Sequence, residues 1–280
     1  MNKKKLKILV YIIIACLILV GFTALITFII SKIGNREFVK DLIIGLIIDG
    51  IILFLSFIVN CIRSLFKCLI DARVYNYSQK YNNKRIRLSF AYLIRIRVNN
   101  KYLLVKSGHD RNLYGPVGGV YHMNHTNYVY NELGFSRDET PGDNNDIRGT
   151  ILGKNISKFI KWFNKGIDRE VSPNREFFEE LIESGVVPEA LFKDLSFTFV
   201  GTKYRGVEYD NFYKIDELCR FDIFELVLNK EQEEFFSSLK RKGHVLLFTN
   251  DEINSGGVDK NNDRRIVGTQ TVYILEDERL

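Results

Sequence analysis

The sequence predicts a two-helix transmembrane hairpin followed by an α/β (α+β) sandwich domain. Three patterns in the 280 residues support this division. Residues 8–30 carry no charged side chain, and residues 42–62 form a second apolar run. Residues 89–98 place large apolar side chains at every second position, which is the period of a β-strand.

Each N-terminal run is long enough to cross a membrane, since a span needs about 20 predominantly apolar residues. A cleaved signal peptide is the alternative for the first run, but its apolar stretch is normally only about 7 to 15 residues long. Basic residues precede the first run and follow the second, so the positive-inside tendency places both termini in the cytoplasm. We therefore expect a two-span protein of the cell inner membrane.

A polar stripe runs along the second predicted span. At about 100° per residue, Asp49, Ser56 and Asn60 fall on one side of the helix. A carboxylate in the membrane interior costs at least about 2.5 kcal/mol and normally faces protein or water. Self-association of several hairpins, with formation of a pore, is one interpretation. A simple anchor, in which a hydroxyl group caps Asp49, is the other.

The predicted organisation has three parts: a membrane hairpin at residues 1–70, a basic linker at 71–88, and a soluble domain at 89–280. Much of the net charge of +6 flanks the predicted spans, where membrane orientation and anionic lipid explain it. We therefore exclude a polynucleotide-binding protein. The four cysteines lack the paired spacing of a disulfide framework or a zinc site.

Strands alternate with helices in the predicted soluble domain. Residues 89–106 are expected to form a β-hairpin with one buried face, turning at Asn99 and Asn100. Residues 124–148 are predicted to be largely loop, and residues 156–163 a short amphipathic helix. Further strands are expected at residues 195–204, 207–213 and 221–228, with a helix at 230–241 and another apolar run at 244–248. This mixture favours an α/β or α+β sandwich.

An acidic helix is expected at residues 174–184, after Ser172 and Pro173 as N-cap and first helical residue and before Gly185 as the stop. At least three of its carboxylates share one face, because they are spaced three, four and seven residues apart. These glutamates are Glu176, Glu179, Glu180 and Glu183. Such a cluster repels itself unless a cation, a basic partner or water compensates.

Gly118 and Gly119, followed by the string R-E-F-F-E-E at residues 175–180, resemble the NUDIX box of nucleoside-diphosphate hydrolases. The resemblance implies a NUDIX-like fold in which Glu179 and Glu180 bind magnesium and Arg175 orients a glutamate. This sequence departs from the family in three ways. A long segment, rather than a short loop, separates the glycines from the helix; the upstream glutamate is missing; and the glycine after the helix is displaced.

Two membrane helices joined to a degenerate NUDIX-like domain resemble the membrane effectors of bacterial CBASS antiphage systems, the SMODS-associated NUDIX class. The resemblance implies that a CD-NTase makes a cyclic oligonucleotide after infection. The effector would bind it, a cyclic dinucleotide being favoured, then assemble and disrupt the inner membrane, causing abortive infection. It implies a receptor rather than an enzyme, with no required cofactor and Mg²⁺ as the metal that an intact motif would hold.

For the ligand pocket we select four residues, because guanidinium groups bind phosphates and aromatic rings stack on bases. They are Arg111, Tyr114, Tyr204 and Arg205. A surface or packing role is the alternative for each. Two other functions stay open at this point. One is a membrane-anchored, Mg-dependent NUDIX hydrolase of nucleoside diphosphate derivatives, and the other is a passive membrane scaffold.

Overall fold

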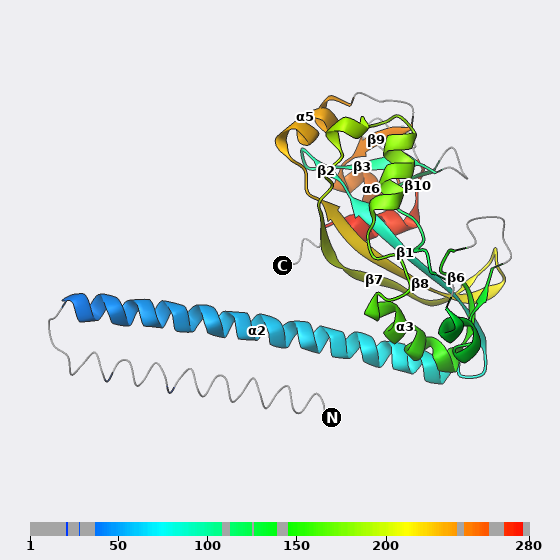
Figure 1. Ribbon diagram of the computed structural model, residues 1–280, viewed down its shortest axis with the longest axis horizontal. Coiled ribbons are helices and arrows are strands. Elements are labelled where there is room, and N and C mark those ends of the chain that lie inside the picture. The colour runs from blue at the N-terminus through cyan, green and yellow to red at the C-terminus, as the bar shows by residue number, and fades with distance from the viewer. Residues whose placement is uncertain are drawn as a thin grey trace. The chain divides into compact units, whose positions relative to one another are not determined.

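The computed structural model describes residues 21, 28, 37–107, 113–124, 126–138, 145–239, 244–257 and 266–276. The chain divides into two compact units, residues 1–76 and 77–280. Helix α2 (Glu37–Lys80) belongs mainly to the first unit, and its last turn begins the second. Figure 1 shows α2 as one long, uninterrupted helix.

Among the residues described, the structure contains no helix that is both long and apolar enough to cross a membrane. The first predicted span, residues 8–30, lies outside the described residues apart from Gly21 and Phe28. The second, residues 42–62, lies within α2. The expected linker at 71–88 holds the end of α2 and the start of the first strand. Both spans stay predictions.

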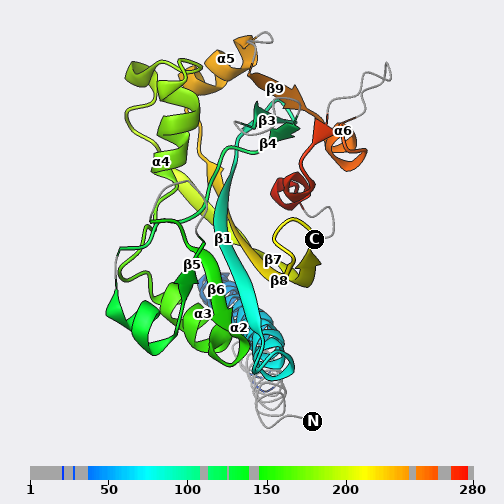
Figure 2. The same ribbon diagram turned by 90° about the vertical axis from the view of Figure 1, so that its right-hand side faces the viewer.

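The described part of the second unit contains two five-stranded sheets surrounded by short helices (Figures 1 and 2). The first sheet has the order β5-β6-β1-β8-β7, with β1 (Arg85–Arg95), β5 (Ser136–Arg137), β6 (Arg148–Leu152), β7 (Phe197–Asp210) and β8 (Ile215–Leu226). The second has the order β10-β4-β3-β2, with β9 also paired to β3. Its strands are β2 (Arg97–Val98), β3 (Lys101–Lys106), β4 (Leu113–Gly115), β9 (Val245–Phe248) and β10 (Ile266–Val267). This architecture confirms the predicted mixed α/β class.

The helices of the second unit are short. They are α3 (Ile156–Lys165), α4 (Asn174–Phe177), α5 (Lys230–Ser238) and α6 (Asn250–Asn254). Single turns of π or 3₁₀ geometry add η1 (Tyr128–Glu132), η2 (Gly153–Asn155), η3 (Phe178–Glu183), η4 (Glu189–Leu191) and η5 (Thr269–Ile274). The segment 124–148, predicted to be largely loop, contains η1 and β5 in its described part.

Strand β1 connects the two sheets. Only Ile96 separates it from β2, so one nearly continuous run passes from the first sheet into the second. The prediction of a single buried face is wrong, because β1 is buried on both faces. Phe90 packs against α3 on one side, with ring centroids 5.5 Å from Phe159. Leu93, on the other side, belongs to the core cluster of the second sheet.

The predicted hairpin turn at Asn99 and Asn100 is confirmed. Val98 pairs with Lys101 across it, so the two asparagines form a two-residue loop between β2 and β3. Their φ angles of 49° and 59° lie in the left-handed region. A two-residue hairpin loop needs this backbone, and asparagine adopts it more readily than most side chains.

Helix α3 confirms the amphipathic helix predicted at residues 156–163. Its buried face carries five large side chains: Ile156, Phe159, Ile160, Trp162 and Phe163. The Phe163 ring lies 4.9 Å from Phe90 and 5.1 Å from Tyr121 in edge-on contacts, which add to the free energy of apolar burial. Gly166, at φ 67°, ends the helix in the left-handed conformation.

The predicted strand boundaries after residue 195 are partly wrong. Strand β7 continues through Gly206, because a register shift there accommodates the glycine as a bulge rather than a turn. The chain instead reverses after Asp210, whose carboxylate accepts hydrogen bonds from two N–H groups of the turn at 2.9 Å each. β8 therefore begins at Ile215, earlier than the predicted residue 221.

Candidate functional site

The acidic helix predicted at residues 174–184 is present as α4 and the π-helical turn η3. It begins at Asn174, as the predicted range has it, but the N-cap is Pro173 rather than Ser172; the Ser172 hydroxyl accepts a hydrogen bond from the Asn174 N–H at 3.3 Å. Gly185, at φ 71°, ends it as predicted. Phe177 is buried against Phe192, so the helix is fixed by its apolar side, while Glu176 and Glu180 face the glycine pair.

Arg175 is the centre of an ion cluster on this helix. Its guanidinium donates to Glu176 at 2.7 Å and to Glu179 at 3.3 Å. It also donates to the Val120 carbonyl at 2.9 Å, which ties the helix to the strand end that follows the glycines. Burial disfavours the charged form of Arg175. The neighbouring acidic groups, among which Glu176 has the largest effect, nevertheless raise the pKa of Arg175 overall. The guanidinium thus neutralises the carboxylates around it.

Glu170 completes this cluster, although the sequence comparison overlooked it. Its two carboxylate oxygens lie 3.3 Å from Arg175, and it also accepts a hydrogen bond from the Tyr92 hydroxyl at 3.3 Å. The His122 N–H donates to it at 3.2 Å. Glu170 stands five residues before Arg175, so a search at the family's spacing of eight finds Ile167 instead. In the folded structure, Glu170 therefore places a carboxylate from upstream of the acidic helix beside Arg175.

The glycine pair and the helix meet in space, despite the long segment between them. The Gly118 N–H donates to the Glu180 carboxyl group at 3.0 Å. A Cβ at Gly119 would lie 1.8 Å from the Glu176 carboxyl oxygen, and one at Gly118 would lie 2.2 Å from the Tyr92 carbonyl. Gly118 also has φ 149°. Position 118 therefore requires glycine, whereas a Cβ at Gly119 would displace the Glu176 side chain.

The environment of Glu180 favours its neutral form. Burial raises the pKa of Glu180 to about 8, and the charges of Glu176 and Glu179 act in the same direction. The hydrogen bond from Gly118 opposes this shift without overcoming it. Burial likewise raises the pKa of Glu176, although Arg175 counters it. Near neutral pH, Glu180 is therefore largely a protonated carboxylic acid.

A magnesium ion requires ionised oxygen ligands in a nearly octahedral arrangement. In the described parts of the chain, no three His, Cys, Asp or Glu side chains are grouped so that they could hold a metal. Glu179 is paired with Arg175, and Glu180 is largely protonated. In this arrangement the two glutamates do not fit a magnesium ion, and their metal role stays a prediction.

Of the four residues selected for a ligand pocket, the structure describes three, and it places Tyr114 on a different sheet from Tyr204 and Arg205. Arg111 lies outside the described residues. Tyr114 on β4 is buried in the core of the second sheet, 5.5 Å from the Phe248 ring. Tyr204 and Arg205 lie on β7 of the first sheet, where Arg205 pairs with Glu217. Their ligand roles stay predictions.

Buried ion pairs also connect the strands of the first sheet. Arg87 on β1 contacts Glu217 on β8 and donates to Asp138 at 2.6 Å. Arg220 donates to Asp222 at 2.9 Å, both on β8. Sequence analysis missed these partners, because charged residues in the first half of β8 suggest an exposed segment until their partners on β1 are known.

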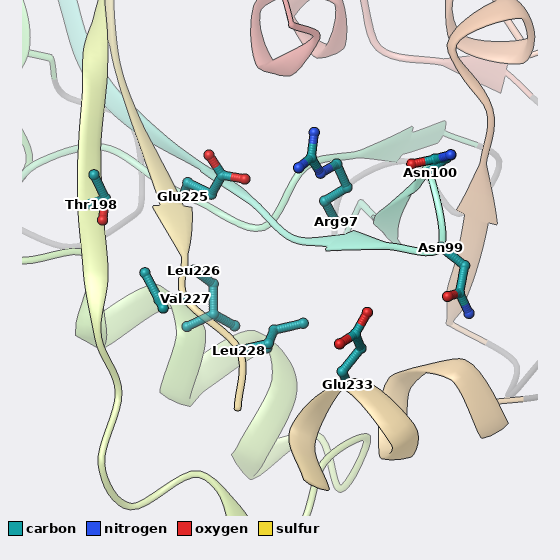
Figure 3. Close-up of a pocket in the computed structure, with 9 residues that line it drawn as sticks. All are labelled: Arg97, Asn99, Asn100, Thr198, Glu225, Leu226, Val227, Leu228 and Glu233. Atoms are coloured by element: carbon teal, nitrogen blue, oxygen red, sulfur yellow. The ribbon is translucent and has the colours of Figure 1, made fainter. Parts of the chain in front are cut away.

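A pocket of about 700 Å³ lies beside the β2–β3 hairpin. Figure 3 shows its walls, which come from the hairpin, the end of β8, β7 and α5. The lining residues are Arg97, Asn99, Asn100, Thr198, Glu225, Leu226, Val227, Leu228 and Glu233. A smaller groove of about 520 Å³ follows the outer side of the acidic helix, including Arg175 and Glu179. Tyr114, Tyr204 and Arg205 line neither of them.

The family model of the SMODS-associated NUDIX domain matches residues 85–275, which is more than half of the chain. The chain belongs to the SMODS-associated NUDIX family. The match confirms the NUDIX part of the predicted architecture, and this NUDIX domain is of the type found in CBASS effectors. The comparison with curated proteins gave no match.

Proposed function

We propose that the NUDIX domain of this protein is a receptor for a cyclic oligonucleotide, with a cyclic dinucleotide as the favoured ligand, and is not a hydrolase. The observation that carries this proposal is the state of the motif carboxylates. Arg175 supplies the positive charge beside Glu176 and Glu179, and Glu180 is kept neutral by burial. Few ionised oxygens are then left for the metal that hydrolysis of a pyrophosphate would need.

In this proposal the N-terminal unit is a membrane hairpin of the cell inner membrane. In support, α2 exposes large apolar side chains along several turns, and such a surface needs lipid or protein to cover it. They are Ile48, Ile51, Ile52, Leu53, Leu55, Phe57 and Val59. Asp49, Ser56 and Asn60 are exposed on the same helix. A carboxylate among apolar side chains favours association of several hairpins over a single anchor.

Ligand binding would drive self-association of the chain and rearrangement of the hairpins, which disrupts the membrane and aborts the infection. The cyclic oligonucleotide would come from a CD-NTase. A ligand can act as such a switch only if it binds the assembled state more tightly than the resting one. A nearly complete switch requires a difference of about 5.5 kcal/mol.

Replacing both Glu179 and Glu180 by Gln tests the choice between receptor and hydrolase. A receptor should bind a cyclic dinucleotide with unchanged affinity, and neither the wild-type protein nor the variant should release pyrophosphate or phosphate from linear nucleotides. Metal-dependent turnover in the wild-type protein that is lost in the variant would contradict the proposal.

The hydrolase remains the second candidate, because the motif helix and the glycine pair are in direct contact despite their separation in sequence. It would be a membrane-anchored enzyme acting on nucleoside diphosphate derivatives. The same double variant tests it, since turnover and magnesium binding should both disappear.

Asp49→Leu tests the role of the polar stripe. If Asp49 lines an assembled element, the variant should bind the cyclic dinucleotide normally but no longer release dye from liposomes. Equal leakage from the wild-type protein and the variant would contradict a role for Asp49 and favour the anchor alternative. Ser56→Leu on the same side of α2 provides a second, uncharged test of the stripe.

A further inference from the structure

We propose that the pocket beside the β2–β3 hairpin binds the amino-bearing edge of a purine base. This inference rests on the proposed receptor function and assigns the place where a cyclic nucleotide would be recognised. The pocket volume of about 700 Å³ lies within the range of roughly 300 to 1,000 Å³ that is usual for small-molecule sites.

The hairpin presents its polar groups from a fixed backbone. Asn99 and Asn100 are held in the left-handed conformation by the two-residue turn. The Asn99 amide donates a hydrogen bond to the Ser237 hydroxyl on α5 at 2.9 Å, which ties the turn to the opposite wall. The Asn100 side chain is exposed and lines the pocket. An asparagine amide offers one donor and one acceptor in a plane, which matches the edge of a base.

The charge of the pocket selects a base over a phosphate. Its ionisable lining residues are one cation, Arg97, and two anions, Glu225 and Glu233. Glu225 is paired with Arg95 at 3.5 Å, whereas no described residue forms an ion pair with the Glu233 carboxylate. A carboxylate accepts hydrogen bonds from the amino group of a base but repels a phosphate.

Apolar side chains complete the site. Leu226 is buried, Leu228 is half-buried, and Val227 is 50% exposed at the end of β8. Figure 3 shows these three residues next to one another on one side of the pocket. They give this side of the pocket apolar surface against which a base can pack, as in most ligand sites.

Arg97 gives the phosphates of the same ligand a place at the rim. Its guanidinium pairs with Glu276, and both side chains are about half exposed. Exposed ion pairs of this kind contribute little to stability, so the guanidinium can turn to a phosphate oxygen at small cost. The pocket thus separates base recognition by Asn100 and Glu233 from phosphate contact by Arg97.

Isothermal titration of the full-length protein in lipid nanodiscs tests this assignment. The probes are cyclic di-AMP, cyclic di-GMP and cyclic di-UMP, of which the two purine compounds carry exocyclic amino groups. We expect a purine compound to bind more tightly than cyclic di-UMP. Asn100→Gly keeps the left-handed turn but removes the amide, and Glu233→Gln keeps the side-chain size but removes the charge. Each should weaken purine binding about tenfold, the usual effect of losing one good hydrogen bond.

Asn211→Gly is the matched control, because Asn211 is an exposed turn asparagine outside the pocket. It should bind like the wild-type protein. Tighter binding by Glu233→Gln would show that a phosphate occupies the pocket and would overturn the inference. Wild-type affinity in both pocket variants would overturn it as well, while the receptor function would stand. Binding of none of the probes would overturn the inference and the receptor function together.

Discussion

Glu180→Gln should make the folded protein less sensitive to pH. Burial raises the pKa of Glu180 from 4.5 to about 8, so between these values the folded state holds a proton that the unfolded state has lost. The carboxyl group therefore favours folding below pH 4.5, and this contribution is lost as the pH rises to 8. The full shift corresponds to about 5 kcal/mol, and partial exposure of the side chain reduces our expectation to about 2 to 3 kcal/mol.

Glutamine at this position keeps an oxygen that accepts the Gly118 N–H but does not titrate. The melting temperature of the wild-type protein should therefore fall between pH 5 and pH 8.5 by about 5 to 10 °C more than that of the variant. Scanning calorimetry of the full-length protein in detergent across this range measures the difference. Glu183→Gln is the control, because Glu183 is an exposed glutamate of the same helix whose charge is not among those that shift the pKa of Glu180, so its loss should leave the slope unchanged. Parallel pH profiles for wild-type protein and Glu180→Gln would refute the reasoning.

Three further predictions follow from the packing. Gly118→Ala and Gly119→Ala should each lower the free energy of unfolding by about 1 to 3 kcal/mol, and Gly118→Ala should lower it more. A Cβ at Gly118 would meet the Tyr92 carbonyl, and the backbone there has a positive φ. Equal chemical-denaturation midpoints for the two variants would contradict this. Arg175→Met should cost about 2 to 4 kcal/mol at pH 7 and less at pH 4, because burial raises the pKa of Glu176 and its freed carboxyl group takes up a proton as the pH falls; an equal loss at both pH values would contradict the ion cluster. Phe163→Ala should cost about 3 to 5 kcal/mol in the same unfolding assay, and a loss below 1 kcal/mol would contradict its place in the core.

Periodicity and turn chemistry predicted local structure well. The Asn99–Asn100 turn, the apolar face of α3 and the Gly185 helix end were all confirmed, because each depends on a short stretch of sequence. The same rules failed to predict the first half of β8, because they treat charged residues as exposed. Glu217 is buried there, where it pairs with Arg87, which is far away in the sequence. The break between the strands predicted at residues 195–204 and 207–213 was wrong for a similar reason: only the partner strand shows that β7 continues through the bulge at Gly206.

In the candidate site, too, local features were predicted and contacts between distant segments were not. The sequence identified the glycine pair and the acidic helix, but the gap between them gave no reason to expect contact. Glu170 was missed because it reaches Arg175 at a spacing that the family pattern does not use. The pocket beside β2 and β3 was also missed, since its walls come from four elements that only the fold brings together.

The central claim is that this NUDIX domain senses a cyclic nucleotide and acts on a membrane. The most direct test is dye leakage from liposomes that carry the full-length protein, titrated with cyclic di-AMP, cyclic di-GMP and cyclic di-UMP, with pyrophosphate release from linear nucleotides measured in parallel. We predict leakage with a purine cyclic dinucleotide and no pyrophosphate release. Intact liposomes with every cyclic nucleotide, together with pyrophosphate release from linear ones, would contradict the account and establish the hydrolase.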